Sequence, residues 1–184
     1  MNARAAPVAA AVAMTITVAV TGACASIRNE AAPTCSSKRL DPLILLTQSV
    51  PTATRIPCIA SYPAGWDLGR VDVRSGKATF ALDSDRAGHE ALRVTLERSC
   101  NVAGATEVPT DEPDTRRFER ILSVDRGLRA TRVYRFAGGC VSYRLQFSEK
   151  GQALVNEASI AVGFVTRSQV DARVRETTHG RRHL

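Results

Sequence analysis

The stretch VDVRSGKATFAL, residues 71–82, decides how the middle of this chain folds. Val71 and Val73 alternate with charged side chains, and apolar residues again take every second position after Ser75-Gly76. A period of two residues is typical of a β-strand with one buried face, and Ser-Gly suits a two-residue turn. The stretch therefore predicts an antiparallel hairpin.

The same alternation continues along the chain. Further strands are indicated at 92–97, 118–124, 131–136 and 141–147, where apolar residues occupy alternate positions. Together with the hairpin they make about six strands, arranged as two successive meanders. Clean alternation means that one sheet face is buried and the other is in water.

Helical periodicity flanks the strands. The pair Asp41-Pro42 combines a capping residue with a proline suited to a first turn, so a short helix is expected from 42 to about 48. Apolar residues at three- and four-residue spacing predict a helix over 152–165 that covers the sheet. Ser168 and Asp171 form a capping-box pattern for a second helix to about 176. The expected fold class is α+β, an antiparallel sheet with a short N-terminal helix and C-terminal helices packed on one face.

Residues 1–23 have the layout of an export signal. Arg4 is followed by an apolar run to Val20 and by small residues before Cys24. The stretch 20–24, Val-Thr-Gly-Ala-Cys, resembles the lipobox of bacterial lipoproteins, in which a small residue precedes a cysteine that receives diacylglycerol. The resemblance implies that Cys24 is lipidated and holds the chain on the outer face of the cell membrane.

Two other interpretations of the leader stay open. A secretory signal cut near Ala23 or Ala25 would give a secreted protein with a free or intermolecular thiol. An uncleaved leader would anchor the chain through residues 5–23. All three interpretations place the remaining chain outside the cytoplasmic membrane.

The cysteines support this location. If Cys24 carries lipid, four remain, enough for two disulfides in an oxidising compartment. Of the three possible pairings we favour Cys100 with Cys140, at one end of the sheet, and Cys35 with Cys58. Zinc is the alternative, but no Cys-x-x-Cys pair or suitably spaced histidine occurs, so no metal or other cofactor is predicted.

After the leader, the chain is organised as one domain. Residues 24–40 are predicted to be a flexible tether, 41–176 a single α+β domain, and 177–184 a disordered tail with nothing to bury. The formal net charge is +7, which favours anionic neighbours such as lipid headgroups or acidic polymers. Nucleic acid is an unsuitable partner for an exported domain.

Arginines are concentrated between residues 116 and 135. They are candidates for binding phosphate or carboxylate groups, although a solvated strand face with internal ion pairs explains them better. The candidates are Arg116, Arg117, Arg120, Arg129, Arg132 and Arg135.

A second cluster contains Asp83, Asp85, His89 and Glu90. It is the place in the sequence where carboxylates and a histidine gather, so it would supply the acid and base of a hydrolase. Residues 83–88 also resemble half of a calcium loop, but position 87 is alanine and the twelfth position is Val94. A polar turn explains these residues better than a metal site.

Several short runs resemble exported, often lipid-anchored bacterial proteins to which no activity is assigned. They include Pro63-Ala64-Gly65-Trp66, residues 82–88, residues 104–109 and Gly138-Gly139-Cys140. The resemblance covers most of residues 40–175 and implies location and a compact domain, with no catalytic residue. We therefore expect a lipid-anchored, non-catalytic envelope module that binds a membrane protein or an anionic component. The alternative is a secreted or envelope hydrolase.

Overall fold

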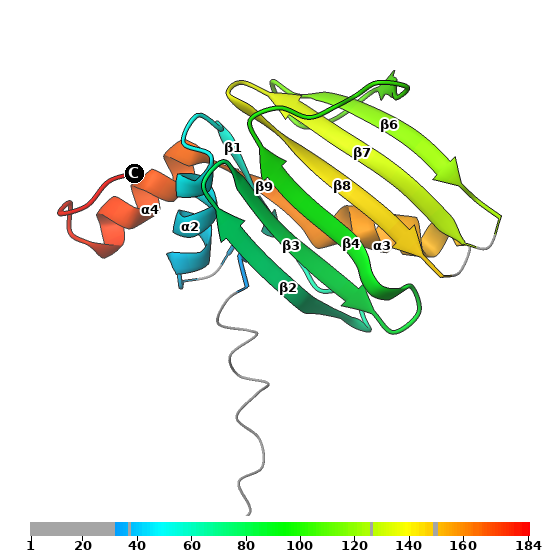
Figure 1. The fold of residues 1–184 in the computed structure, drawn as a ribbon. Coiled ribbons are helices and arrows are strands. Elements are labelled where there is room, and N and C mark those ends of the chain that lie inside the picture. The colour runs from blue at the N-terminus through cyan, green and yellow to red at the C-terminus, as the bar shows by residue number, and fades with distance from the viewer. Residues whose placement is uncertain (1–31, 37, 126, 149–150) are drawn as a thin grey trace, which may run out of the picture.

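The computed structural model describes residues 32–36, 38–125, 127–148 and 151–184 (Figure 1). This part of the chain is α+β, as the sequence predicts, with three helices and two antiparallel sheets. The helices are α2 (Asp41–Ser49), α3 (Gln152–Ala161) and α4 (Arg167–Thr177). The small sheet contains β1 (Arg55–Ile59) and β9 (Val162–Thr166). The large sheet contains β2 (Trp66–Arg74), β3 (Lys77–Ser84), β4 (Gly88–Glu97), β5 (Thr106–Val108), β6 (Arg116–Ser123), β7 (Leu128–Phe136) and β8 (Gly139–Phe147).

The large sheet joins two meanders through its central strands. Its order is β2-β3-β4-β8-β7-β6-β5, so β4 and β8 pair directly although they are distant in sequence. Glu97 lies opposite Cys140 at one end of this ladder. The hairpin predicted within residues 71–82 is confirmed, because Arg74 pairs with Lys77 across the two-residue turn.

One face of the large sheet carries the core. Phe80, Leu92, Val94 and Val141 are fully buried there, on the central strands. Figure 1 shows α3 and β9 lying behind this face, with α2 and α4 at one end of it. The opposite face, turned toward the viewer, carries no described helix. The sheet therefore has the buried face and the largely wet face that alternation predicts. The exception on the second face is a small buried cluster of Phe118, Val133 and Cys140, on which the β4–β5 connection packs.

Both favoured disulfides are confirmed. Cys35 and Cys58 have Cα atoms 5.0 Å apart and tie the segment before α2 to β1. Cys100 and Cys140 have Cα atoms 6.0 Å apart and tie the β4–β5 connection to the start of β8. The second bridge lies at the sheet end as expected, because Cys140 is the cross-strand partner of Glu97, three residues before Cys100.

The helix predicted over 152–165 is wrong beyond Ala161. The next five residues, Val-Gly-Phe-Val-Thr, form β9 and pair with β1. Branched and aromatic side chains favour extended backbone, and β1 supplies the hydrogen-bonding partner that a helix would not need. Val165 is buried, as the helical spacing predicted, but from a strand opposite Ile56.

The predicted helix caps also differ from the structure. The capping box of α4 is formed by Thr166 and Gln169, and the side chain of each residue accepts the backbone N–H of the other. This capping box begins two residues before Ser168, the residue at which the sequence predicted it. At α2, Asp41 is the first helical residue and no side-chain cap is present at Leu40. The Asp41 carboxylate still lies in the first turn, where it interacts favourably with the helix dipole.

Asp171 binds the end of the chain instead of capping α4. Its carboxylate accepts the N–H of Leu184 at 2.7 Å and pairs with Arg175 at 2.7 Å. The hydrogen bond from Leu184 and the charge of Arg175 hold the pKa of Asp171 below its usual value, against the opposing effect of desolvation. Leu184 is partly buried against the core, so the segment predicted as a tail contributes one side chain to packing. Disorder of residues 177–184 stays a prediction.

Candidate functional site

The open face of the large sheet contains a polar groove. The groove has a volume of about 370 Å³ and crosses β2, β3, β4 and β8. Its lining residues are Arg70, Asp72, Arg74, Lys77, Thr79, Ala81, Glu90, Arg93, Thr95, Glu97, Ser142 and Arg144.

Four ion pairs neutralise much of the charge in this groove. They are Arg70 with Asp72, Arg74 with Asp72, Lys77 with Glu97, and Arg93 with Glu90. Arg144 is exposed and has no hydrogen-bond or ion-pair partner within the described chain. It also lies directly opposite Arg93 in the β4–β8 ladder. Like charges at opposed positions repel, and Glu90 compensates Arg93 but not Arg144.

A bulge in β4 opens a hollow beside the groove. The β4–β8 ladder ends at Leu92 and Leu145, although both strands continue past these residues. Glu90 has a φ angle of 45°, a left-handed conformation that displaces the strand, and β3 and β4 lose register beside it. β8 regains contact with the turn before β4 where the N–H of Ser148 donates to the carbonyl of Ala87 at 2.9 Å. The gap between these points is the hollow.

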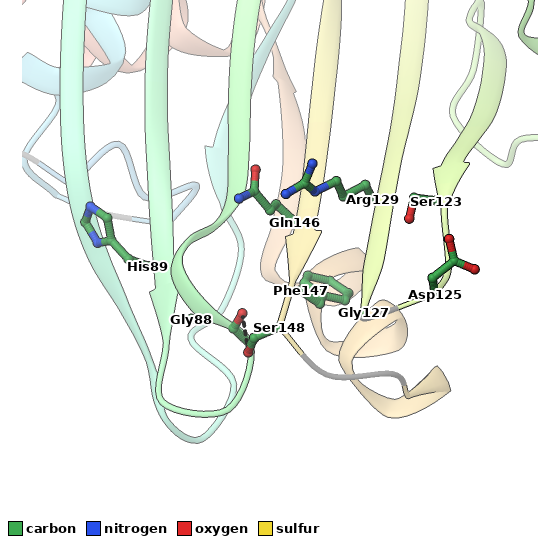
Figure 2. A pocket seen from close by; sticks show the side chains of 10 residues that line it. Gly88, His89, Ser123, Asp125, Gly127, Arg129, Gln146, Phe147 and Ser148 are labelled. Carbon is green, nitrogen blue, oxygen red and sulfur yellow. Dashed lines mark hydrogen bonds between the residues drawn. The ribbon is translucent and has the colours of Figure 1, made fainter.

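The hollow has a volume of about 440 Å³ and is closed on its third side by the β6–β7 hairpin (Figure 2). Its lining residues are Ala87, Gly88, His89, Ser123, Asp125, Gly127, Arg129, Gln146, Phe147 and Ser148. Figure 2 shows Arg129 and Gln146 close together, with Ser123 and Asp125 beyond the arginine. Arg129 is the cross-strand partner of Gln146.

Arg129 and Arg144 connect the hollow to the groove. Arg144 is the partner of Thr131, two residues along β7 from Arg129, so the two arginines are diagonal neighbours. Such positions are about 7–8 Å apart. Arg129 is also exposed and has no hydrogen-bond or ion-pair partner in the described residues. With Gln146, these two guanidinium groups are able to donate to one phosphate or carboxylate group, or to two linked groups.

The six arginines predicted as one surface are divided between the two faces. Register along β6 and β7 places Arg116, Arg120, Arg129 and Arg135 on the open face, and Arg117 and Arg132 on the core face. Three of the six are paired with carboxylates: Arg116 with Glu107 and Arg132 with Glu119 at 2.6 Å each, and Arg117 with Glu119 at 3.5 Å. The structure therefore does not bring the six together, and Arg129 is the member that lines the hollow.

Arg144 and Gln146 were not among the residues chosen from the sequence. Both occupy outward-facing positions in the strand predicted over 141–147, so alternation alone places them on the wet face. Their position beside Arg129 depends on the β7–β8 register, which the sequence pattern does not provide.

The acidic and histidine cluster is partly assembled. His89 Nδ1 lies 2.9 Å from Asp83 Oδ1, which also accepts the N–H of Glu90 at 2.7 Å. The Glu90 side chain is bound to Arg93, and Asp85 is exposed on the turn after β3. The structure thus pairs Asp83 with His89 and leaves the other two carboxylates in different surroundings. Within the described residues, no group of three or more His, Cys, Asp or Glu side chains is arranged to hold a metal ion.

Trp66 stabilises the fold near this cluster. It is 2% exposed, and its indole N–H donates to Glu157 on α3 at 2.8 Å. Arg86 donates to the same carboxylate oxygen at 2.6 Å. These two hydrogen bonds, first that of Arg86, hold the pKa of Glu157 below its usual value. Trp66 is therefore a residue at the edge of the core that links β2 to α3.

The candidate site lies on the open polar sheet face of an α+β domain. Comparison with protein-family models, curated proteins and solved structures finds no match. Among the helices described, none is long and apolar enough to cross a membrane. Cys24 and the rest of the leader lie outside the described residues, so lipidation stays a prediction.

Proposed function

We propose that this chain is a non-catalytic binding module of the bacterial cell envelope, held at the outer face of the cell membrane by lipid on Cys24. Its ligand is an anionic envelope component, which binds on the open face of the large sheet. The observation that carries this proposal is the unpaired arginine pair, Arg129 and Arg144, at the junction of the hollow and the groove.

Charge placement supports an anionic ligand. In the groove the carboxylates already have cationic partners, whereas Arg129 and Arg144 have none in the described chain. An arginine fork matches the oxygens of phosphate and carboxylate, and the formal net charge of +7 attracts such ligands from a distance. The ligand class is therefore an extended molecule with phosphate or carboxylate groups that spans β4, β8 and β7.

The two disulfides support a location outside the cytosol. Disulfides persist in oxidising compartments and are rare in reducing ones. Their presence in the four predicted positions agrees with the export signal in residues 1–23 and with the lipobox-like stretch that ends at Cys24.

Calorimetric titration of the full chain in detergent tests the proposal. Poly(glycerol phosphate) and poly-glutamate serve as separate phosphate and carboxylate probes. Replacing Arg129 and Arg144 by glutamine should weaken binding of the preferred probe roughly 30-fold, at about 1 kcal/mol for each exposed contact. Binding should also weaken as salt rises.

The matched control removes the same charge elsewhere. Arg98→Gln/Arg182→Gln changes two exposed arginines outside the hollow and groove, and should leave affinity within about twofold. Equal losses in both double variants would mean that net charge alone attracts the probe, and no binding of either probe would remove the proposed ligand class.

The alternative function is a hydrolase that uses the cluster at residues 83–90. The contact between Asp83 and His89 favours it, since a carboxylate that orients a histidine is common in general-base sites. Asp83→Asn discriminates the two functions, because Asp83 lines neither the hollow nor the groove: it should abolish hydrolysis but leave anion binding by Arg129 and Arg144 nearly unchanged.

A further inference from the structure

The end of the β6–β7 hairpin exposes an unusual amount of apolar side chain. Ile121, Leu122 and Val124 are 69%, 51% and 51% exposed. The other large apolar residues exposed in the described chain are Leu45, Tyr62 and Ile160, on separate elements. Adjacent exposed apolar residues indicate a contact surface more strongly than scattered ones do. We call residues 121–125 the hairpin tip.

The sheet topology explains why the hairpin tip is uncovered. β5 pairs with β6 only from Arg117 to Glu119, so the later residues of β6 form a free sheet edge. A bulge between Ile121 and Ser123 then shifts the register with β7. The alternation that buries apolar side chains in the rest of the sheet is lost here. The hairpin tip therefore exposes apolar side chains, while Ser123 and Asp125 line the hollow.

Cationic side chains border the hairpin tip. Arg120 precedes it on β6, and Arg129 follows it on β7, where both are exposed on the open face. Arg120 uses one nitrogen to bind the carbonyl of Ala103 at 3.1 Å, and Arg129 has no partner in the described residues. Asp125 is the one acid within the tip.

We propose that the hairpin tip contacts the surface of a membrane that contains anionic lipids, with Leu122 and Val124 among the headgroups and Arg120 beside a lipid phosphate. Apolar side chains next to arginines are typical of interfacial segments. Three apolar side chains are too few for a stable protein interface, which buries at least about 1,000 Å² in total. This contact goes beyond the proposed anion-binding function, because it is made by the apolar side chains and orients the domain on the membrane.

Quenching by brominated lipids tests the proposal in the full chain. Leu122→Trp is reconstituted into vesicles of brominated phosphatidylcholine with phosphatidylglycerol, and its fluorescence is compared with that in unbrominated vesicles. The native Trp66 is buried and gives a constant background. Leu45→Trp is the matched control, since Leu45 is 53% exposed on α2, at the other end of the molecule from the hairpin tip (Figure 1).

The expected result is at least twofold stronger quenching at position 122 than at position 45, with a decrease when phosphatidylglycerol is omitted. Because every variant keeps the same leader, attachment of the chain to the vesicle is equal in both. Unquenched fluorescence at position 122, or equal quenching at both positions, would overturn the proposal. Either result leaves the arginine titrations unaffected, so the two proposals fail separately.

Discussion

Removal of the Cys100–Cys140 disulfide should destabilise the domain by an amount that follows from its position. The bridge closes a loop with a sequence separation of 40 residues, for which the loss of chain entropy in the unfolded state corresponds to about 4 kcal/mol. For a chain of this size the melting temperature should fall by roughly 8–16 °C in the variant Cys100→Ala/Cys140→Ala.

Urea denaturation measures this loss directly, with fluorescence of the buried Trp66 as the signal. The slope of unfolding free energy against urea should also rise, because the unfolded chain without the bridge exposes more surface. Cys35→Ala/Cys58→Ala is a parallel variant with a separation of 23 residues, for which the same relation gives about 3.4 kcal/mol.

Packing around the bridge has to be separated from chain entropy. Cys140 is 1% exposed and packs with Phe118 and Val133, while Val102 packs on the same cluster from the β4–β5 connection. Val102→Ala removes only packing and should lower the unfolding free energy by about 1 kcal/mol. A loss below about 1 kcal/mol for the Cys100/Cys140 variant would refute the loop-closure reasoning.

Two further predictions concern a turn and an ion pair. Gly138→Ala should lower the free energy of unfolding by about 2–3 kcal/mol, because φ is 77° at this residue and an added Cβ would clash with the carbonyl oxygen of Thr52. An unchanged midpoint in urea denaturation would contradict this prediction. Glu157 has a folded-state pKa held below its usual 4.5, chiefly by Arg86, so its stabilisation is present above about pH 5 and is lost as pH falls through the folded pKa. Glu157→Gln keeps an acceptor for Trp66 but loses the charge that Arg86 binds. The difference in unfolding free energy between wild type and variant should therefore shrink from pH 6 to pH 3. A constant difference would exclude the ionic contribution.

Much of the fold could be predicted because its signals are local. The hairpin at residues 71–82 combines alternation with a two-residue turn, and both lie within a short stretch. The cysteine pairing also followed from strand direction, since the meander places Cys100 and Cys140 at the same sheet end. These features need no knowledge of contacts between distant residues.

The features that sequence reasoning missed depend on distant partners. The spacing of Leu154, Ala158, Ala161 and Val165 fits a continuous helix, and only pairing with β1 makes the last of them part of a strand. Likewise the hollow depends on the left-handed backbone of Glu90 and on where β4 and β8 separate. Alternation alone predicts the division of the arginines between two faces, because neighbours in a strand such as Arg116 and Arg117 point in opposite directions.

A wet sheet face does not by itself explain the arginine pair. Water satisfies exposed polar groups, so threonine, serine or paired charges would serve on such a face, and most of the groove is built in that way. Arg144 instead lies opposite Arg93 and has no carboxylate partner among the described residues. Arg129, which borders the hollow, has none there either. Because Arg93 is already paired with Glu90, an anionic group bound here would compensate chiefly the charges of Arg144 and Arg129. The proposed anionic ligand would supply the negative charge that these two arginines lack within the described residues.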